Sequence, residues 1–430
     1  MTTYLEGHLA PVPDEIDAAD LPVTGVLPEE LAGRYFRNGP NPKPGVDPGS
    51  WFTGDGMIHG VRLRDGRAEW YRNRWVRTSR FTHDAPYVTE RGPDRAAVQA
   101  NTHVIHHAGK ILALVEAGFP YEMSGELDTV GPCDFGGRLT TGMTAHPKEL
   151  DGELHFFGYG VVPPYLTYHR LDSAGELVES RVVEVPGPTM MHDFAVTEHY
   201  VVWLDLPVVF DMERLGRGMP FSWSDAYGAR LGVMDRAGGT RWFEVDPCYV
   251  FHVGNAREDA QGRVVLDGVR YSREGFAKTW TIIGGQDDPT PRAGVALLHR
   301  WTLDPATGAV KEEQLDDRSV EFPTFNEDRL GRASRYLYAV TDGELVKYDL
   351  ERGTGTVTPV GGHAGEAVFV PRADARAEDD GWLMSIVDDR LLVHEATDLH
   401  EVAAVRLPRR VPAGFHGSWI ADQPAARPSP

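Results

Sequence analysis

Short apolar segments, separated by turn residues, run along almost the whole chain. Six of them are rich in aliphatic, β-branched or aromatic residues and are predicted as strands: residues 111–115, 154–157, 200–204, 264–266, 336–340 and 382–387. No run of about 18 apolar residues is present, so no membrane-spanning helix is predicted. The pattern predicts an all-β fold.

A hairpin pattern recurs along the chain, in which an apolar strand ends in Asp, turn residues with Gly follow, and a second strand returns. It is found at residues 61–66, 168–175, 232–238, 301–308 and 346–353. Asp bonds to nearby backbone N–H groups and Gly accepts positive φ, so both favour such turns. With a blade of about 60 residues, the chain length predicts about seven blades of a β-propeller. A pair of β-sandwiches is the alternative, but no linker separates two halves, and we expect one domain over residues 1–430.

Two segments depart from this pattern. Residues 210–227 form a long insertion with Met, Phe and Trp, which is either a loop packed on the propeller face, or a lid or a cavity mouth that contacts a membrane. The Pro-rich tail, residues 421–430, is predicted to be mobile.

Composition excludes several classes of partner. With 43 Lys and Arg against 64 Asp and Glu, the formal charge is −21, which disfavours nucleic acid and electrostatic attachment to anionic lipids. Two cysteines are too few for a disulfide framework, and the N-terminus lacks a signal-peptide pattern. We therefore expect a cytoplasmic enzyme; the sequence gives no indication of oligomeric state.

Four histidines stand out among the 17, because small or turn-forming residues surround them at the ends of apolar segments. They are His146, His192, His252 and His416. Neutral imidazole is the commonest metal ligand and suits iron, zinc and copper. They are far apart in sequence, so only a shared axis would bring them together. For an arbitrary histidine, a surface or hydrogen-bonded core role is the more common one, and that alternative stays open.

Three glutamates beside apolar segments add to this hypothesis: Glu116, Glu321 and Glu366. A carboxylate there is costly unless it is paired, and metal-bound imidazoles commonly donate their second N–H to a carboxylate. The alternative is that all three are ordinary strand-end residues in an acidic chain. Spacing alone does not decide between the two.

The chain resembles the carotenoid cleavage oxygenase family, which includes lignostilbene dioxygenases. The resemblance extends from Gly33 to Trp419 and rests on nine fragments in the family's order: residues 33–42, 51–60, 112–118, 144–148, 191–194, 251–256, 321–323, 365–371 and 414–419. It implies a seven-bladed propeller with a loop and helix cap over the active-site face and Fe(II) on the axis. No dinucleotide fingerprint is present, consistent with a reaction that needs no organic cofactor.

The resemblance also assigns roles to residues. It implies that the four histidines are iron ligands and that Glu116, Glu321 and Glu366 serve His192, His252 and His416, which leaves His146 without a carboxylate. Thr102 matches the threonine that crowds one open iron position in similar enzymes. The implied reaction inserts both atoms of O₂ across a C=C bond of an apolar alkene and gives two carbonyl products.

The substrate is less well defined. Hydroxystilbene-cleaving relatives have a lysine immediately before the first glutamate, where this chain has Val115. Together with Phe251, next to a predicted ligand, Val115 favours an apolar lining and hence a carotenoid or apocarotenoid. A hydroxystilbene or phenylpropanoid held by other residues is the alternative. A metal-free propeller that serves as a binding module, or a propeller hydrolase using a bound cation, accounts less well for the seven His and Glu residues.

Overall fold

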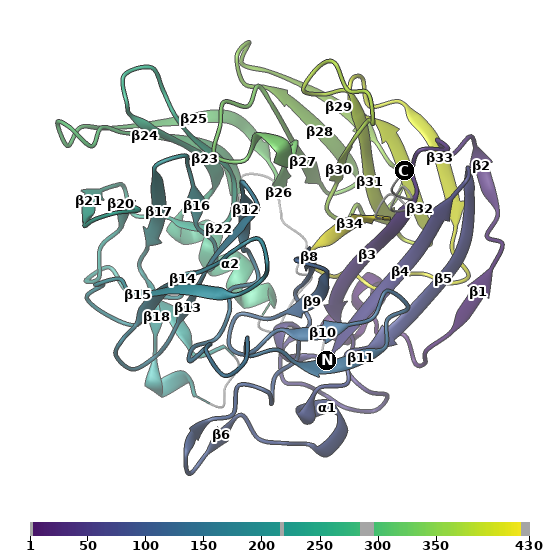
Figure 1. Cartoon of the computed structure of the whole chain (residues 1–430), viewed down its shortest axis with the longest axis horizontal. Coiled ribbons are helices and arrows are strands. Elements are labelled where there is room, and N and C mark those ends of the chain that lie inside the picture. Colours follow the sequence, from purple (N-terminus) through teal and green to yellow (C-terminus); the bar gives the residue numbers. More distant parts are fainter. Residues whose placement is uncertain (1–2, 216–218, 284–295, 423–430) are drawn as a thin grey trace, which may run out of the picture.

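Seven sheets arranged around a central axis make up the molecule (Figure 1). The computed structural model describes residues 3–215, 219–283 and 296–422. Within these residues each of the seven sheets has four or five strands, so the fold is a seven-bladed β-propeller, as the hairpin pattern and the resemblance predict. In this part of the chain no helix is long and apolar enough to cross a membrane.

The blades follow one another along the chain, each an antiparallel meander. Blade one comprises β1 (Asp17–Ala19), β3 (Gly33–Pro40), β4 (Gly56–Arg64), β5 (Arg67–Trp75) and β34 (Gly417–Ala421). Blade two comprises β8 (His103–His107), β9 (Lys110–Leu114), β10 (Tyr121–Met123) and β11 (Thr129–Pro132). Blade three comprises β12 (Lys148–Leu150), β13 (Glu153–Tyr159), β14 (Leu166–Leu171) and β15 (Leu177–Val182). Blade four comprises β16 (Ala195–Val196), β17 (Tyr200–Asp205), β20 (Arg230–Asp235) and β21 (Thr240–Glu244).

The last three blades repeat this arrangement. Blade five comprises β22 (Tyr249–Glu258), β23 (Val264–Tyr271), β24 (Ala296–Leu303) and β25 (Val310–Ser319). Blade six comprises β26 (Glu321–Thr324), β27 (Tyr336–Thr341), β28 (Glu344–Asp349) and β29 (Thr354–Pro359). Blade seven comprises β2 (Val23–Gly25), β30 (Val368–Pro371), β31 (Gly381–Val387), β32 (Arg390–Glu395) and β33 (Glu401–Arg406).

The six predicted strands and the five predicted hairpins are present. The strands correspond to β9, β13, β17, β23, β27 and β31, and the hairpins join β4 to β5, β14 to β15, β20 to β21, β24 to β25 and β28 to β29. In the first hairpin Asp65 and Gly66 both have positive φ, at 50° and 66°. Two such residues form the tight turn that matches the twist of the flanking strands.

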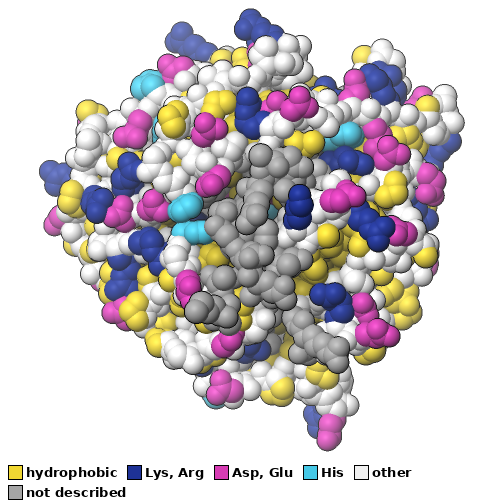
Figure 2. All heavy atoms as spheres, turned by 180° about the vertical axis from the view of Figure 1, so that it is seen from behind, with side chains coloured by type: hydrophobic (Ala, Val, Ile, Leu, Met, Phe, Trp, Pro, Cys, Tyr) yellow, Lys and Arg dark blue, Asp and Glu magenta, His cyan; other side chains and the backbone are white. Residues whose placement is uncertain are grey.

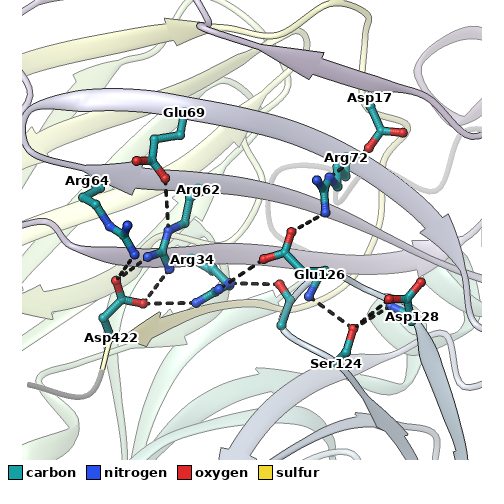
Figure 3. Close-up of polar contacts among 11 residues, drawn as sticks. Asp17, Arg34, Arg62, Arg64, Glu69, Arg72, Ser124, Glu126, Asp128 and Asp422 are labelled. Carbon is teal, nitrogen blue, oxygen red and sulfur yellow. Dashed lines mark hydrogen bonds and ion pairs between the residues drawn. The ribbon is translucent and has the colours of Figure 1, made fainter. Parts of the chain in front are cut away.

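Both ends of the chain close the ring. The C-terminal strand β34 pairs with β3, and the N-terminal strand β2 pairs with β33 of blade seven. Yellow and purple strands therefore lie side by side at the right of Figure 1. Just after β34, the Asp422 carboxylate lies among three arginines of blade one, Arg34, Arg62 and Arg64 (Figure 3).

Short elements lie outside the blades, and all of them except α1 contribute residues to the wall of the large cavity at the axis. They are the helices α1 (Ser79–His83) and α2 (Arg273–Ile283), and the hairpins β6 (Val88–Thr89) with β7 (Gly92–Pro93) and β18 (Val208–Phe210) with β19 (Phe221–Trp223). Five short 3-10 turns complete the described elements: η1 (Thr3–Leu5), η2 (Gly7–Leu9), η3 (Trp51–Thr53), η4 (Met212–Arg214) and η5 (Glu327–Arg329).

The insertion at 210–227 begins at the end of β18 and includes η4 and β19, with Met212 70% and Leu215 58% exposed. Residues 216–218 of this insertion and most of the tail predicted to be mobile, 423–430, lie outside the described residues.

Candidate metal centre

All seven blades contribute one of the seven predicted His and Glu residues to the axis. The histidines lie in or just before innermost strands: His416 before β34, His146 before β12, His192 before β16, and His252 within β22. Glu116 follows β9 of blade two, Glu321 begins β26 of blade six, and Glu366 precedes β30 of blade seven. Residues far apart in sequence meet because each blade directs one strand toward the axis.

The four imidazoles form one cluster in which His146 and His252 each contact the other three rings. Ring centroids of His146 lie 4.5 Å from those of His192, 4.6 Å from His416 and 5.2 Å from His252. His252 is in turn 5.2 Å from His192 and 4.9 Å from His416. The Nε2 atoms of His146 and His192 are 3.1 Å apart, and one nitrogen from each of His146, His192 and His252 lies within 4.8 Å of the others.

Each glutamate contacts one imidazole through Nδ1. The pairs are Glu116 with His192, Glu321 Oε2 with His252 at 2.6 Å, and Glu366 Oε1 with His416 at 3.1 Å. These are the pairings that the resemblance implies. No hydrogen bond joins His146 to a carboxylate within the described residues.

The protonation state of the site suits a cation. A carboxylate at Nδ1 holds the proton there, which leaves the lone pair of Nε2 free to bind a metal. Burial, with the neighbouring His192, His416 and His252, keeps the pKa of His146 well below its ordinary value, so this ring is neutral. The donors therefore fit a divalent ion that accepts nitrogen ligands, such as iron.

The carboxylates stay ionised despite their burial. Burial alone raises the pKa of Glu321, but the His252 ring, the Tyr271 hydroxyl and the Phe322 N–H outweigh it, and the pKa is lowered. The pKa of Glu366 is lowered in the same way, because His416, His103 and the Gly417 N–H outweigh burial. Two negative charges are thus fixed beside two of the imidazoles.

Two tyrosines that no sequence pattern indicated bind two of the glutamates: Tyr159 is half-buried and Tyr271 is buried. The Tyr159 hydroxyl donates to Glu116 Oε2 at 2.7 Å, and the Tyr271 hydroxyl donates to Glu321 Oε1. Glu366 instead accepts the Gly417 N–H at 2.8 Å. Tyr271 ends β23 and reaches a glutamate of the next blade, so no local motif connects the two.

Asp193 is a second residue that the sequence analysis did not single out, although it lies in the Met-His-Asp-Phe fragment. It is 1% exposed, and Oδ1 accepts the Phe194 N–H and lies 2.8 Å from Lys148 Nζ. Oδ2 accepts the Val253 N–H at 2.8 Å. Asp193 therefore joins the segments that carry His146, His192 and His252.

Phe322 lies against the imidazoles in a strained conformation. Its ring centroid is 5.0 Å from that of His252 and 5.4 Å from that of His416. Its φ is 52°, in the left-handed region that a bulky side chain rarely adopts. The bond from its N–H to Glu321 Oε2, at 2.7 Å, helps to hold this conformation.

A cavity of about 1120 Å³ opens onto the centre. Its wall includes His192, His252, His416 and the three remaining residues proposed from the sequence, Thr102, Val115 and Phe251. Much of the rest is aromatic, with Phe52 stacked on Phe415 at 5.6 Å and Trp280 of α2 close to Phe251. The site is therefore an imidazole cluster at the wall of a large, mainly apolar cavity.

Known proteins match the chain over nearly its whole length. The family model described as retinal pigment epithelial membrane protein matches residues 9–421. A carotenoid cleavage oxygenase from Mycobacterium tuberculosis is 42% identical, covering 97% of both chains. The chain belongs to the carotenoid cleavage oxygenase family.

Solved structures of family members are similar to this fold. A lignostilbene dioxygenase from Pseudomonas brassicacearum superposes with a TM-score of 0.85 at 28% identity, covering 98% of this chain and 99% of that one. The cobalt-substituted apocarotenoid oxygenase of Synechocystis has a TM-score of 0.83 at 27% identity, covering 96% and 97%. The family assignment made from the sequence is confirmed, and with it the assignment as an oxygenase.

Proposed function

We propose that this enzyme is a non-haem Fe(II) dioxygenase that cleaves a C=C bond of a carotenoid or apocarotenoid with O₂, giving two carbonyl products. His146, His192, His252 and His416 hold the ion, and Glu116, Glu321 and Glu366 fix three of these ligands. The observation that carries the proposal is the convergence of the four imidazoles, three with carboxylate-bound Nδ1, at the wall of an apolar cavity.

When bound, ferrous iron supplies the one-electron chemistry that O₂ needs to react with a closed-shell alkene. The chain supplies the rest. The glutamates hold each proton on Nδ1, and the aromatic wall excludes water and orients the alkene across the imidazole cluster. The backbone carbonyl of Thr102 accepts the backbone N–H of His416, and the Thr102 hydroxyl donates to Asn101 Oδ1. These two bonds fix the Thr102 side chain in the cavity wall, where it narrows access to the centre.

Cavity volume and lining favour an extended polyene. Small-molecule pockets usually span roughly 300–1,000 Å³, and this cavity lies at or above the upper end of that range. Val115 lies in its wall at the position where hydroxystilbene-cleaving relatives have lysine. The second candidate, cleavage of a hydroxystilbene, is favoured by the TM-score of 0.85 with a lignostilbene dioxygenase.

Product analysis tests both candidates. The protein is loaded anaerobically with Fe(II), assayed for about one iron per chain, and incubated under ¹⁸O₂ with an apocarotenal or with a hydroxystilbene. We expect two carbonyl fragments, each carrying the label, from the apocarotenal and none from the stilbene. Stilbene cleavage alone would select the second candidate, and a protein that takes up no iron would contradict the oxygenase mechanism.

We further propose that the enzyme takes its apolar substrate from a membrane surface through the insertion at 210–227. Exposed apolar side chains lie at or near the cavity wall: Val88 is 75%, Val162 69% and Leu215 58% exposed, and all three line the cavity. Basic and acidic side chains alternate over the face seen in Figure 2, so apolar contact rather than attraction to anionic lipid is the supported mode.

Vesicle flotation tests this contact. Met212→Glu, at a residue that is 70% exposed and does not line the cavity, should abolish binding to neutral phosphatidylcholine vesicles and leave cleavage of a detergent-dispersed substrate unchanged. Val178→Glu is the control, because Val178 is 48% exposed on β15 of blade three and does not line the cavity. Equal vesicle binding by both variants would rule the insertion out as the contact.

A further inference from the structure

A buried arginine lies directly behind the Glu366 and His416 pair. Arg37 lies in β3, where it pairs across the sheet with Gly417, whose N–H binds Glu366. It is 4% exposed. A Cβ atom on Gly365 would lie 3.2 Å from Arg37 Nη1, and one on Gly414 would lie 2.6 Å from Nη2. The guanidinium therefore fills the space between the two segments that carry Glu366 and His416.

Arg37 has few partners for a buried cation. Its Nη2 donates to the Pro412 carbonyl, and Nε has no hydrogen-bond partner among the described residues. Burial, with a smaller effect of Arg410, lowers the pKa of Arg37 to about 10, while Tyr35, Tyr71 and Glu366 oppose this shift, so the group remains a cation at neutral pH. A buried charge without a direct ion pair is costly unless charge nearby compensates it.

The charges around the axis supply that compensation. The four imidazoles are neutral ligands, and the three glutamates carry one more negative charge than a divalent ion cancels. Lys148 and Asp193, which also lie beside the site, are 2.8 Å apart and cancel each other. Arg37, next to the segment that carries Glu366, supplies a positive charge that offsets this excess.

We propose that Arg37 is a charge-balancing residue of the metal centre, whose positive charge offsets part of the negative charge of the glutamates and so favours Fe(II) over Fe(III). The inference rests on the proposed Fe(II) site. Without Arg37 the surroundings of the ion would be more negative, which stabilises a trivalent ion more than a divalent one. The side chain of Arg37 forms no hydrogen bond with the seven axial residues within the described part of the chain, but it lies in the cavity wall, so its effect on the ion is measured without substrate.

The test measures the oxidation state rather than catalysis. Wild type, Arg37→Gln and Arg37→Lys are loaded with Fe(II), and the Fe(III)/Fe(II) midpoint potential and the rate of ferrous oxidation in air without substrate are recorded. Gln keeps a donor for the Pro412 carbonyl but removes the charge. We expect Arg37→Gln to have a lower potential and to oxidise about tenfold faster, and Arg37→Lys to be close to wild type.

A compensating variant separates charge from structure. In Glu321→Gln the carbonyl oxygen can still accept from His252 and Phe322, while the amide donates to the Tyr271 hydroxyl, so the contacts survive without the charge. This change alone should raise the potential, and Arg37→Gln with Glu321→Gln should return it toward wild type. If Arg37→Gln does not fold alone, the double variant is compared with Glu321→Gln, where the arginine change should again lower the potential.

The outcomes distinguish this inference from the proposed function. An iron-loaded, folded Arg37→Gln with wild-type potential and oxidation rate overturns the charge-balancing role and leaves the oxygenase proposal intact. A drop in midpoint potential that is equal in Arg37→Gln and Arg37→Lys would not depend on charge, and it also overturns the charge-balancing role. A wild-type protein that binds no ferrous ion overturns both.

Discussion

At the scale of single residues, the chemistry depends on which nitrogen of each imidazole carries a proton. Three of the four rings have Nδ1 bound by a carboxylate, and His146 is held neutral by its buried surroundings. Neutral rings with free Nε2 lone pairs are metal ligands, whereas protonated ones repel a cation.

Removing one of these rings should abolish metal binding at stoichiometric concentrations. We expect His192→Ala to purify without iron and to lack cleavage activity, as measured by metal analysis and product formation. His400→Ala is the matched control, because His400 also has Nδ1 on a carboxylate, Asp398 at 2.7 Å, but is exposed on blade seven. Iron retained at wild-type levels in His192→Ala would remove this histidine from the ligand set.

The tyrosine behind Glu321 should matter through the carboxylate it binds. Tyr271→Phe removes the hydroxyl that fixes Glu321, and we expect metal affinity to fall about tenfold, measured by chelator competition, with a changed Co(II) absorption spectrum. Tyr249→Phe is the control, since this buried hydroxyl donates to the Met190 carbonyl and forms no hydrogen bond with a glutamate among the described residues. Equal effects of the two changes would show a general packing loss instead.

Residues that the sequence identified and those that it missed differ in how they are connected. The imidazoles and glutamates each lie in a short fragment with a recognisable neighbourhood, so the family resemblance could pair them. Tyr271 and Arg37 act across blade boundaries, on a glutamate of blade six and on the Glu366 pair of blade seven. Such contacts depend on how neighbouring blades pack, which no local pattern contains.

At the scale of elements, short connections position the ligands. Asp193 links β12, β16 and β22 through Lys148, Phe194 N–H and Val253 N–H. Strand periodicity predicted six strands and five hairpins correctly because those features are local. It gave no information on the irregular segments just before β12 and β16, where His146 and His192 lie.

Breaking the link at Asp193 should therefore loosen three ligands at once. Asp193→Asn removes the charge opposite Lys148, and we expect metal affinity to fall roughly 10- to 100-fold, with destabilisation of about 3 kcal/mol. Asp267→Asn serves as the control, because Asp267 is 1% exposed and pairs with Arg300 and Arg257 within blade five. It should destabilise the fold without changing metal affinity, as measured by denaturant unfolding and chelator competition.

At the scale of the whole molecule, the ring is held closed by strands from both ends of the chain. Hairpin recurrence predicted the number of blades, but the pairing of β34 with β3 and of β2 with β33 depends on closure of the ring and left no pattern in the sequence. The ion-pair cluster around Asp422 strengthens this closure (Figure 3).

The contribution of Asp422 should depend on pH. Burial alone raises its pKa, but Arg62, Arg64 and Arg34 outweigh burial and the pKa is lowered. A lowered folded-state pKa adds stability that is complete above the unfolded value, about 3.9, and is lost as pH falls through the folded value. We expect Asp422→Asn to cost about 1 kcal/mol at pH 7 and progressively less in more acidic solution.

Denaturant unfolding at neutral and acidic pH checks this prediction. Asp342→Asn is the control, because Asp342 forms a single exposed pair with His363 and should change stability little. A cost for Asp422→Asn that does not shrink in acid would mean that its charge is not what closes the ring.

Because the seven axial residues are spread over all seven blades, the metal centre is complete only when every blade has folded. His416 lies directly before β34, the strand that pairs with β3 and closes blade one. Closure of the ring therefore assembles the ligand set, and an ion bound to all four histidines would in turn hold blades one, three, four and five together.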